Sequence, residues 1–243
     1  MSATSSDTRA PTLGVVGLGS MGLGAALSAV SRGVPTWGLD VRAEPGRKLA
    51  AAGGHVAASL AELAAHCDVV VVLVVNAAQT EQVLFGEEGL AHTLRKGSVL
   101  VCSATVDPAV PPRWEQRLTE QGLWFIDGPV SGGAKKAAEG AMTVMASGKP
   151  EAFAAAGGLL DAIAGKVYHL GERAGIGSTV KMVNQHLAGV HIAAACEAMA
   201  LGMRAGAEPA ALFEVITNSA GNSGCSRTAC RTSWPATTRR CRP

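Results

Sequence analysis

The chain has 243 residues, 48% of them hydrophobic and 16% charged, with a formal net charge of +2. All of its acidic residues precede Gly221 and five arginines follow that residue, so the body of the chain is slightly acidic. This predicts a well-cored soluble protein without a basic stripe for nucleic acid. Because the longest apolar run, Val69 to Val75, is too short to cross a bilayer and no apolar signal core opens the chain, we expect a cytoplasmic protein without a membrane partner.

The predicted elements alternate between strand and helix along most of the chain. Continuous apolar stretches predict strands, and helical spacing with glycine or capping signals predicts helices. Ser59 and Glu62 have the spacing of a capping box. The first expected strand begins at 12, and the later strands cover 35–40, 68–75, 98–104, 123–127, 141–148 and 166–171. The first expected helix ends near 33, and the later helices cover 42–53, 59–67, 79–86, 89–97, 113–122 and 150–165.

The alternation predicts an α/β protein with a doubly wound, mostly parallel sheet. The pattern changes after Gly171, where one long helix is expected from about Gly175 to Gly206 and a shorter one follows. We therefore expect a boundary near Glu172. The predicted domains are 1–171, an incomplete all-α domain at 172–223, and a tail at 224–243.

The first motif, "GLGSMG", has glycines at 17, 19 and 22 between an apolar strand and a helix. Gly17 permits the tight turn, Gly19 lets the backbone approach a pyrophosphate, and Gly22 allows the helix to pack closely on the strand. The N–H groups at the helix start, with Ser20 and Met21, would face the phosphates. Alone, the pattern is weak and is better explained by a plain glycine turn; its position between an apolar strand and a helix predicts a Rossmann-type dinucleotide-binding domain.

Asp40 ends the second predicted strand, about 20 residues after the glycines, as the dinucleotide fingerprint expects. Its carboxylate would accept hydrogen bonds from the adenosine ribose and repel a 2′-phosphate, which favours NAD as the cofactor. Arg42 is the opposing signal, because a nearby arginine can hold a 2′-phosphate. The alternative for Arg42 is a solvated loop residue, and we prefer it.

Two further motifs carry polar groups at element ends. "DGPVSGG", from Asp127 to Gly133, fits a structural turn as well as a nest of N–H groups that binds a carboxylate with Ser131. "GIGSTVKMVNQ" puts Lys181 and Asn184 on one helix face. A lysine beside an apolar stripe is commonly a surface residue whose ammonium reaches water, but a desolvated one exchanges protons near neutral pH. Both readings stay open from spacing alone.

Cysteine and histidine positions give no metal site. We expect Cys67, Cys102 and Cys196 to be buried thiols, because they lie in apolar stretches. His186 and His191 are five residues apart, so they lie on different faces of the long helix and do not form a metal pair.

The three motifs in this order resemble the β-hydroxyacid dehydrogenases, a family that includes 3-hydroxyisobutyrate dehydrogenase and tartronate semialdehyde reductase. The resemblance covers about Leu13 to Asn222. The segment "NQHLAGVHIAAACEAMALGMRAG" is most similar to a branch of the family that oxidises a four-carbon sugar acid with NAD. The resemblance implies a small hydroxy acid as substrate, and a homodimer or tetramer for the intact parent.

The resemblance also implies roles for residues. Lys181 would be the catalytic acid/base that takes the hydroxyl proton as hydride passes to the nicotinamide, and Asn184 would position the substrate beside it. Ser131, Gly132 and Gly133 would bind the substrate carboxylate.

Thr105, in "CSATVDP", matches a cofactor-contacting element of the family near the nicotinamide. The sequence departs from the family there, since Cys102 and Ala104 replace the usual Asp and Ser. Two other functions remain open: a dinucleotide-binding protein without catalysis, and an NADPH-dependent reductase that forms a hydroxy acid or removes an imine.

The last residues, "GNSGCSRTACRTSWPATTRRCRP", share no pattern with the rest. Where the family continues with apolar helices and a second active-site lysine, this segment is rich in Arg, Cys, Thr and Pro. If one base is restored in the gene before the Gly224 codon, the following codons can be read in another frame as WMFENRVPHILAGDYTPLSA. This sequence resembles the corresponding segment of the family. We therefore expect a shifted reading frame, and little solubility or turnover for the chain as it stands; the alternative is a disordered basic tail that binds acidic partners.

Overall fold

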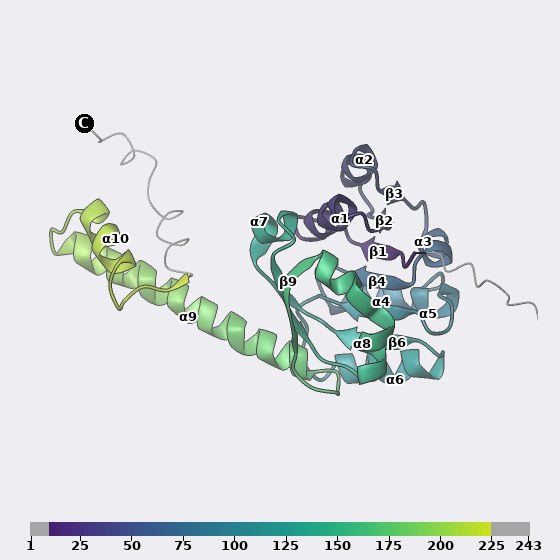
Figure 1. Ribbon diagram of the computed structural model, residues 1–243. Coiled ribbons are helices and arrows are strands. Elements are labelled where there is room, and N and C mark those ends of the chain that lie inside the picture. Colours follow the sequence, from purple (N-terminus) through teal and green to yellow (C-terminus); the bar gives the residue numbers. More distant parts are fainter. Residues whose placement is uncertain (1–9, 225–243) are drawn as a thin grey trace, which may run out of the picture. The chain divides into compact units, whose positions relative to one another are not determined.

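A computed structural model describes residues 10–224 of the chain (Figure 1). It divides into two compact units, Met1–Met182 and Val183–Pro243. The division falls inside the long helix, whereas the predicted boundary near Glu172 precedes it. The predicted out-of-frame tail, apart from Gly224, lies outside the described residues, so it stays a prediction.

The first unit is built on a six-stranded parallel sheet with the order β3-β2-β1-β4-β5-β6. This order places the first strand beside the fourth and reverses the winding of the chain between them, as in doubly wound nucleotide-binding folds. The predicted α/β class and its parallel sheet are confirmed. The strands are β1 Leu13–Val16, β2 Thr36–Leu39, β3 His55–Val56, β4 Val69–Val72, β5 Val99–Cys102 and β6 Trp124–Asp127.

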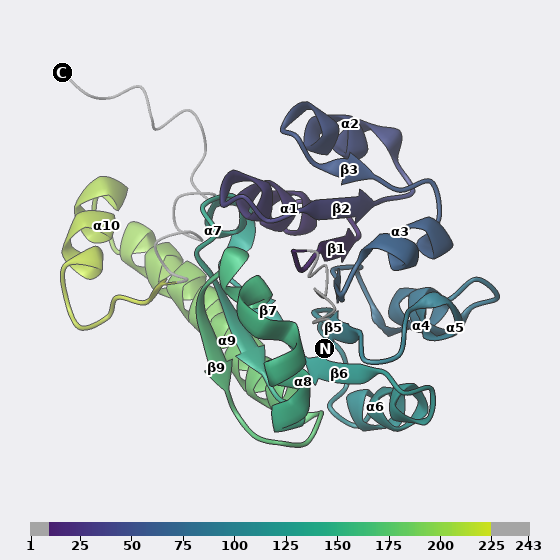
Figure 2. The ribbon, with the colours of Figure 1, turned by 45° about the vertical axis from the view of Figure 1, so that its right-hand side comes forward.

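Both faces of this sheet are buried, which explains why its central strands are apolar at every position. Val69 and Val71 belong to one hydrophobic cluster, and Val70 and Val72 belong to the other. One face packs on α1 Gly22–Ser31, α2 Ala43–Ala51 and α8 Pro150–Ala156, and α7 Gly133–Ala138 packs on α1. The other packs on α3 Leu60–His66, α4 Ala77–Phe85, α5 Leu90–Thr93 and α6 Pro111–Glu120 (Figures 1 and 2).

A second sheet was not predicted. It has three strands, in the order β7-β8-β9, with the bounds β7 Val130–Ser131, β8 Met142–Ala146 and β9 Ala164–His169. β7 and β8 are antiparallel, while β8 and β9 are parallel. The expected strands 141–148 and 166–171 therefore exist but do not extend the main sheet.

The single helix expected at 150–165 is also wrong in its length. α8 ends at Ala156, and a separate 3₁₀ helix, η1, covers Gly157–Ala162. Gly157 has φ +54°, a conformation that ends a helix and favours glycine.

The start of α3 confirms the predicted cap. The Ser59 Oγ accepts from the Glu62 N–H at 3.1 Å, and the Glu62 carboxylate accepts from the Ala58 N–H at 2.6 Å. We expect Ser59→Ala to lower the free energy of unfolding by about 1 kcal/mol, because the helix loses an acceptor for one of its free N–H groups. Urea unfolding measures this loss; Ser59→Asp should keep most of the stability, and an equal loss in both variants would contradict the capping role.

The second unit contains most of α9 Ile176–Arg204, together with α10 Pro209–Thr217. By length and composition alone α9 could span a membrane, which is weak evidence. Several of its apolar side chains are exposed, among them Leu187, Val190 and Leu201. Cys67 and Cys102 are buried as predicted, but Cys196 of α9 is exposed, because it does not lie on a covered face of the helix.

Candidate functional site

The carboxyl ends of neighbouring parallel strands meet at one edge of the main sheet. Val16, at the end of β1, is in register with Leu39 and with Val72. Val72 is in register with Cys102, and Cys102 with Asp127. The glycine-rich loop, the acidic residue after β2, the threonine after β5 and the "DGPVSGG" turn all follow these ends. This is the edge at which doubly wound sheets bind their ligands.

The glycine-rich loop has three glycines with three different constraints. Gly17 has φ +91°, and a Cβ there would lie 2.7 Å from the Leu73 carbonyl oxygen. A Cβ on Gly22 would lie 1.8 Å from the Gly17 oxygen, so α1 packs directly on the turn. A Cβ on Gly19 would meet nothing within 4 Å. The first and third glycines therefore serve the fold, and Gly19 borders open space.

The start of α1 also fits an anionic ligand. Met21 is its N-cap residue and makes no side-chain hydrogen bond to the helix. The first N–H groups of the helix therefore have no side-chain cap, as a phosphate-binding helix requires. Ser20 is exposed and Met21 is half-buried beside it. These residues fit a dinucleotide pyrophosphate.

The Asp40 carboxylate, which follows strand β2, hydrogen-bonds to the glycine-rich loop. Its Oδ2 accepts from the Leu18 N–H at 2.7 Å, and its Oδ1 accepts from the Arg42 N–H at 2.9 Å and from the Arg42 Nε at 3.1 Å. Burial raises the pKa of Asp40, but the hydrogen bonds from Arg42 and Leu18 outweigh burial and lower it overall. Arg42 is paired with this carboxylate, while its side chain remains 62% exposed to solvent as predicted for a loop arginine.

The "DGPVSGG" segment forms a strand end, a short strand and a helix start. Asp127 ends β6, Ser131 ends β7, and α7 begins at Gly133. Gly132 has φ +136° and Gly133 has φ +71°, and a Cβ on Gly133 would meet nothing within 4 Å. Ser131 is half-buried, and both glycines are exposed. The backbone here is therefore open to a ligand, as it is at Gly19.

α7 brings this segment beside the glycine-rich loop. It packs against α1 (Figures 1 and 2), and a Cβ on Gly24 of α1 would lie 2.7 Å from the Ala138 nitrogen of α7. The two open glycine positions thus precede two helices that lie against each other.

Lys181 lies in the second turn of α9 and is 7% exposed. Within residues 10–224 its ammonium has no hydrogen-bond or ion-pair partner, and burial lowers its pKa. An unpartnered buried lysine has the property that an acid/base near neutral pH needs, because its neutral form is favoured. Lys181 is therefore not a surface lysine, although apolar residues next to it in the sequence, such as Met182 and Val183, are exposed.

The remaining predicted site residues are less constrained. Thr105 is exposed after β5. Asn184 is half-buried and lies three residues beyond Lys181 on α9, in the second unit.

The sequence reasoning missed three side chains that hold the start of α9. Asp127, Ser147 and Ser178 are all buried and hydrogen-bond to one another. The only signal in the sequence was the acidic residue that opens "DGPVSGG".

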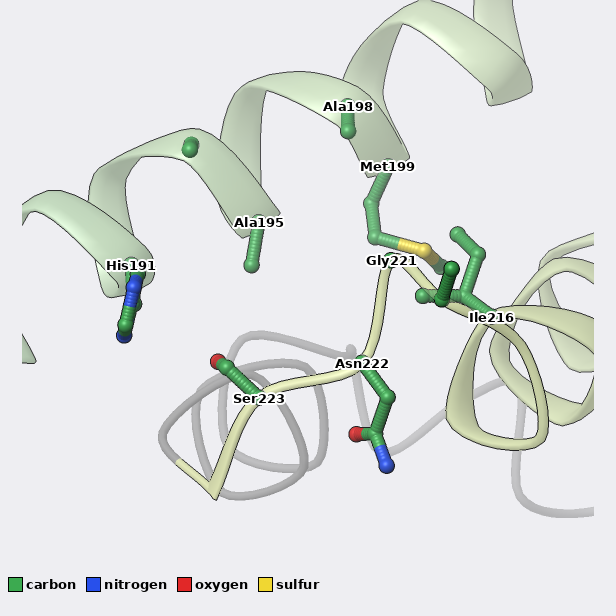
Figure 3. A pocket seen from close by; sticks show the side chains of 10 residues that line it. His191, Ala195, Ala198, Met199, Ile216, Gly221, Asn222 and Ser223 are labelled. Atoms are coloured by element: carbon green, nitrogen blue, oxygen red, sulfur yellow. The ribbon is translucent and has the colours of Figure 1, made fainter.

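A pocket of about 340 Å³ lies in the second unit, between α9 and the segment after α10 (Figure 3). Its walls include His191, Met199, Ile216 and Asn222. Its lining contains none of the predicted site residues.

Two family profiles match the chain. The NAD binding domain of 6-phosphogluconate dehydrogenase matches residues 12–171, and the NAD-binding domain of NADP-dependent 3-hydroxyisobutyrate dehydrogenase matches residues 175–238. The chain is also 55% identical over 211 residues to an L-threonate dehydrogenase of Cupriavidus necator, with 87% of this chain and 71% of that enzyme covered. The chain belongs to the β-hydroxyacid dehydrogenase family.

Other relatives of this β-hydroxyacid dehydrogenase agree. An L-threonate dehydrogenase of Escherichia coli K12 is 50% identical over 87% of this chain and 70% of its own length. The crystal structure of a 3-hydroxyisobutyrate dehydrogenase from Salmonella typhimurium has a TM-score of 0.84 and 48% identity, and covers 90% of this chain and 76% of that one.

Family membership confirms several predictions. The protein is an NAD-dependent hydroxyacid dehydrogenase with a Rossmann-type domain, and its substrate is a small molecule. The individual site residues stay predictions.

Proposed function

We propose that this dehydrogenase oxidises L-threonate to its keto acid, with NAD as the hydride acceptor. The observation that carries the proposal is the buried, unpartnered Lys181 at the start of α9. The choice of L-threonate is supported by relatives of that name at 50–55% identity. The desolvated amine would take the proton from the substrate hydroxyl.

The bound cofactor would supply the hydride-accepting carbon of its nicotinamide. Gly17, Gly19 and Gly22, with Ser20 and Met21, would hold its pyrophosphate by backbone N–H groups. Asp40 would bind the adenosine ribose, and Thr105 would contact the nicotinamide end. Open space at Gly19 and the uncapped start of α1 support these assignments.

The substrate carboxylate would lie on the Ser131–Gly133 segment. Ser131 would offer its hydroxyl, and Gly132 and Gly133 would offer N–H groups; a Cβ at Gly133 would meet nothing within 4 Å. Asn184 would hold a second polar group of the substrate. Binding at both ends would fix which carbon faces the cofactor and so lower the entropic part of the barrier.

A second substrate, 3-hydroxyisobutyrate, is favoured by the name of the Salmonella typhimurium structure at 48% identity. The two acids differ in the hydroxyl groups that Asn184 and its surroundings must bind. The test is kcat/KM for NADH formation with each acid. It is measured on the enzyme produced from a gene in which the one missing base before the Gly224 codon has been restored. L-threonate should give the larger kcat/KM. A larger kcat/KM for 3-hydroxyisobutyrate would make that acid the substrate of this enzyme instead.

Cofactor choice gives a prediction at Asp40. Asp40→Ser should raise the ratio of NADP to NAD affinity by about tenfold, since it removes the charge that repels a 2′-phosphate and frees Arg42 to bind one. Calorimetry of both cofactors measures the ratio. Arg47→Ala, an exposed arginine of α2, is the control and should leave the ratio unchanged; an unchanged ratio in Asp40→Ser would contradict the assignment.

Location and assembly belong to the same proposal. We place the enzyme in the cytoplasm, as a homodimer or tetramer for the intact parent, without nucleic-acid or membrane partners. The exposed apolar side chains of α9 support an oligomer.

A further inference from the structure

The first turn of α9 cannot cap itself. Its preceding residue, Gly175, has φ +98° and no side chain that could accept from the free N–H groups of the helix. The first intrahelical bond runs from the Thr179 N–H to the Gly175 oxygen at 2.9 Å. The N–H groups before Thr179 therefore need acceptors from elsewhere in the fold.

Those acceptors come from two strands that lie far back in the sequence. The Asp127 Oδ2 accepts from the Gly175 N–H at 2.9 Å and from the Ser178 N–H at 2.8 Å. The Ser147 Oγ accepts from the Gly177 N–H at 2.9 Å. The Ser178 hydroxyl also donates to the Asp127 Oδ1 at 2.7 Å. Asp127 ends β6, and Ser147 follows β8.

The two strands are themselves tied at this point. The Asp127 and Ser147 backbones exchange N–H to carbonyl bonds of 2.9 Å in both directions. Their side chains also meet, since the Ser147 hydroxyl donates to the Asp127 Oδ2 at 3.4 Å. Both residues are at most 1% exposed. The acceptors are therefore fixed relative to each other before they bind the helix.

Close backbone contact fixes the helix in the same place. A Cβ on Gly177 would lie 2.3 Å from the Met145 oxygen and 2.7 Å from the Asp127 oxygen. The helix start thus rests directly on the ends of both strands. Lys181 is one turn further along, at i+4 from Gly177 and i+3 from Ser178.

We infer that Asp127, with Ser147, is a positioning residue: it clamps the first turn of α9 and thereby fixes Lys181 relative to the "DGPVSGG" segment. Asp127 opens that segment, so one residue joins the proposed carboxylate-binding backbone to the helix of the proposed acid/base. The inference rests on the proposed function for its meaning, but the clamp itself can be tested without turnover.

The clamp acts through hydrogen bonds and not through the charge of Asp127. Burial is the cause of the lowered pKa of Lys181, and no nearby charge contributes to it. Asp127 does interact electrostatically with Cys102 of β5 and Glu115 of α6. A test must therefore separate loss of the clamp from loss of the charge.

Asp127→Asn and Asp127→Ala make this separation. Both remove the charge, but the asparagine oxygen can still accept from the Gly175 and Ser178 N–H groups while its amide donates to the Ser178 hydroxyl. Alanine leaves both N–H groups without an acceptor. Ser147→Ala is a milder change that removes the acceptor for the Gly177 N–H and the 3.4 Å bond from the Ser147 hydroxyl to Asp127.

The measurement is the pH midpoint of acetylation of Lys181 by acetic anhydride in the 243-residue chain, quantified by mass spectrometry of peptides. Lys135, whose side chain is 88% exposed, is the internal reference. Asp127→Ala should shift the Lys181 midpoint to higher pH, toward that of Lys135, because a loosened turn rehydrates the amine. Asp127→Asn should keep the original midpoint, and Ser147→Ala should shift it in the same direction by less.

Two results would overturn the clamp. An equal shift in Asp127→Asn and Asp127→Ala would assign the effect to charge. An unchanged pH midpoint of Lys181 acetylation in folded Asp127→Ala would show that Asp127 does not position Lys181. If that variant does not fold, an unchanged midpoint in Ser147→Ala would show the same. Retained turnover in Lys181→Ala would overturn the proposed function alone, since the acetylation midpoint does not depend on catalysis.

Discussion

Lys181→Ala should lower kcat for hydroxy acid oxidation by about 10²–10⁴-fold while leaving the Kd for NAD unchanged. The alanine cannot take the hydroxyl proton, so the alkoxide character that drives hydride transfer is no longer supported. Stopped-flow absorbance of NADH gives kcat in the base-restored chain, and calorimetry gives the Kd.

Lys166→Ala is the matched control, because Lys166 is an exposed lysine of β9 in the same unit. It should leave both kcat and Kd as they are. Loss of NAD binding in Lys181→Ala would point to a folding defect, and retained turnover would remove Lys181 from the chemistry.

The pH dependence of kcat in the unaltered enzyme also tests whether Lys181 is the base. Burial lowers the pKa of Lys181, so the neutral amine that accepts the proton is present at lower pH than for an exposed lysine. Oxidation should therefore increase with pH and level off below the ordinary lysine range. An inflection at or above that range would contradict a desolvated base.

Gly19→Ala should weaken NAD binding on the order of 100-fold without lowering the melting temperature. A Cβ at Gly19 meets no protein atom within 4 Å, so the fold tolerates it. The same methyl group would occupy the space through which the pyrophosphate approaches the backbone. Calorimetry and thermal unfolding of one sample measure the two effects.

Substitutions at two other glycines serve as controls for Gly19→Ala. Gly22→Ala should lower the melting temperature, since its Cβ would lie 1.8 Å from the Gly17 oxygen. Gly189→Ala, in α9, also meets nothing within 4 Å and should leave the NAD affinity unchanged without lowering the melting temperature. Normal NAD affinity in Gly19→Ala would show that the cofactor binds elsewhere.

The sequence predicts the main sheet well because its signals are local. Strands such as β4 are apolar at every position, and the glycines at 17, 19 and 22 stand directly between a strand and a helix. The second sheet was missed because nothing in the pattern of 141–148 says which neighbour it pairs with. Pairing of β8 with β7 and β9 depends on tertiary contacts.

The site shows the same division. The position of Asp40 after the second strand predicted a cofactor contact, whereas the roles predicted for Lys181 and Ser131 came from the family resemblance. The capping of α9 by Asp127 was not predicted, since the helix start and its acceptor are 51 residues apart at Ser178. A remote cap leaves no spacing signal, whereas the local cap at Ser59 does.

In the proposed reaction, NAD bound at the edge of the Rossmann-type sheet takes hydride from the hydroxy acid while the buried Lys181 takes the hydroxyl proton. The most direct test is incubation of the base-restored enzyme with NAD and L-threonate deuterated at the carbon to be oxidised, followed by mass spectrometry of the NADH. We expect deuterated NADH from the unaltered enzyme and almost none from Lys181→Ala. Absence of deuterium in NADH formed by the unaltered enzyme, or equal yields from both enzymes, would contradict it.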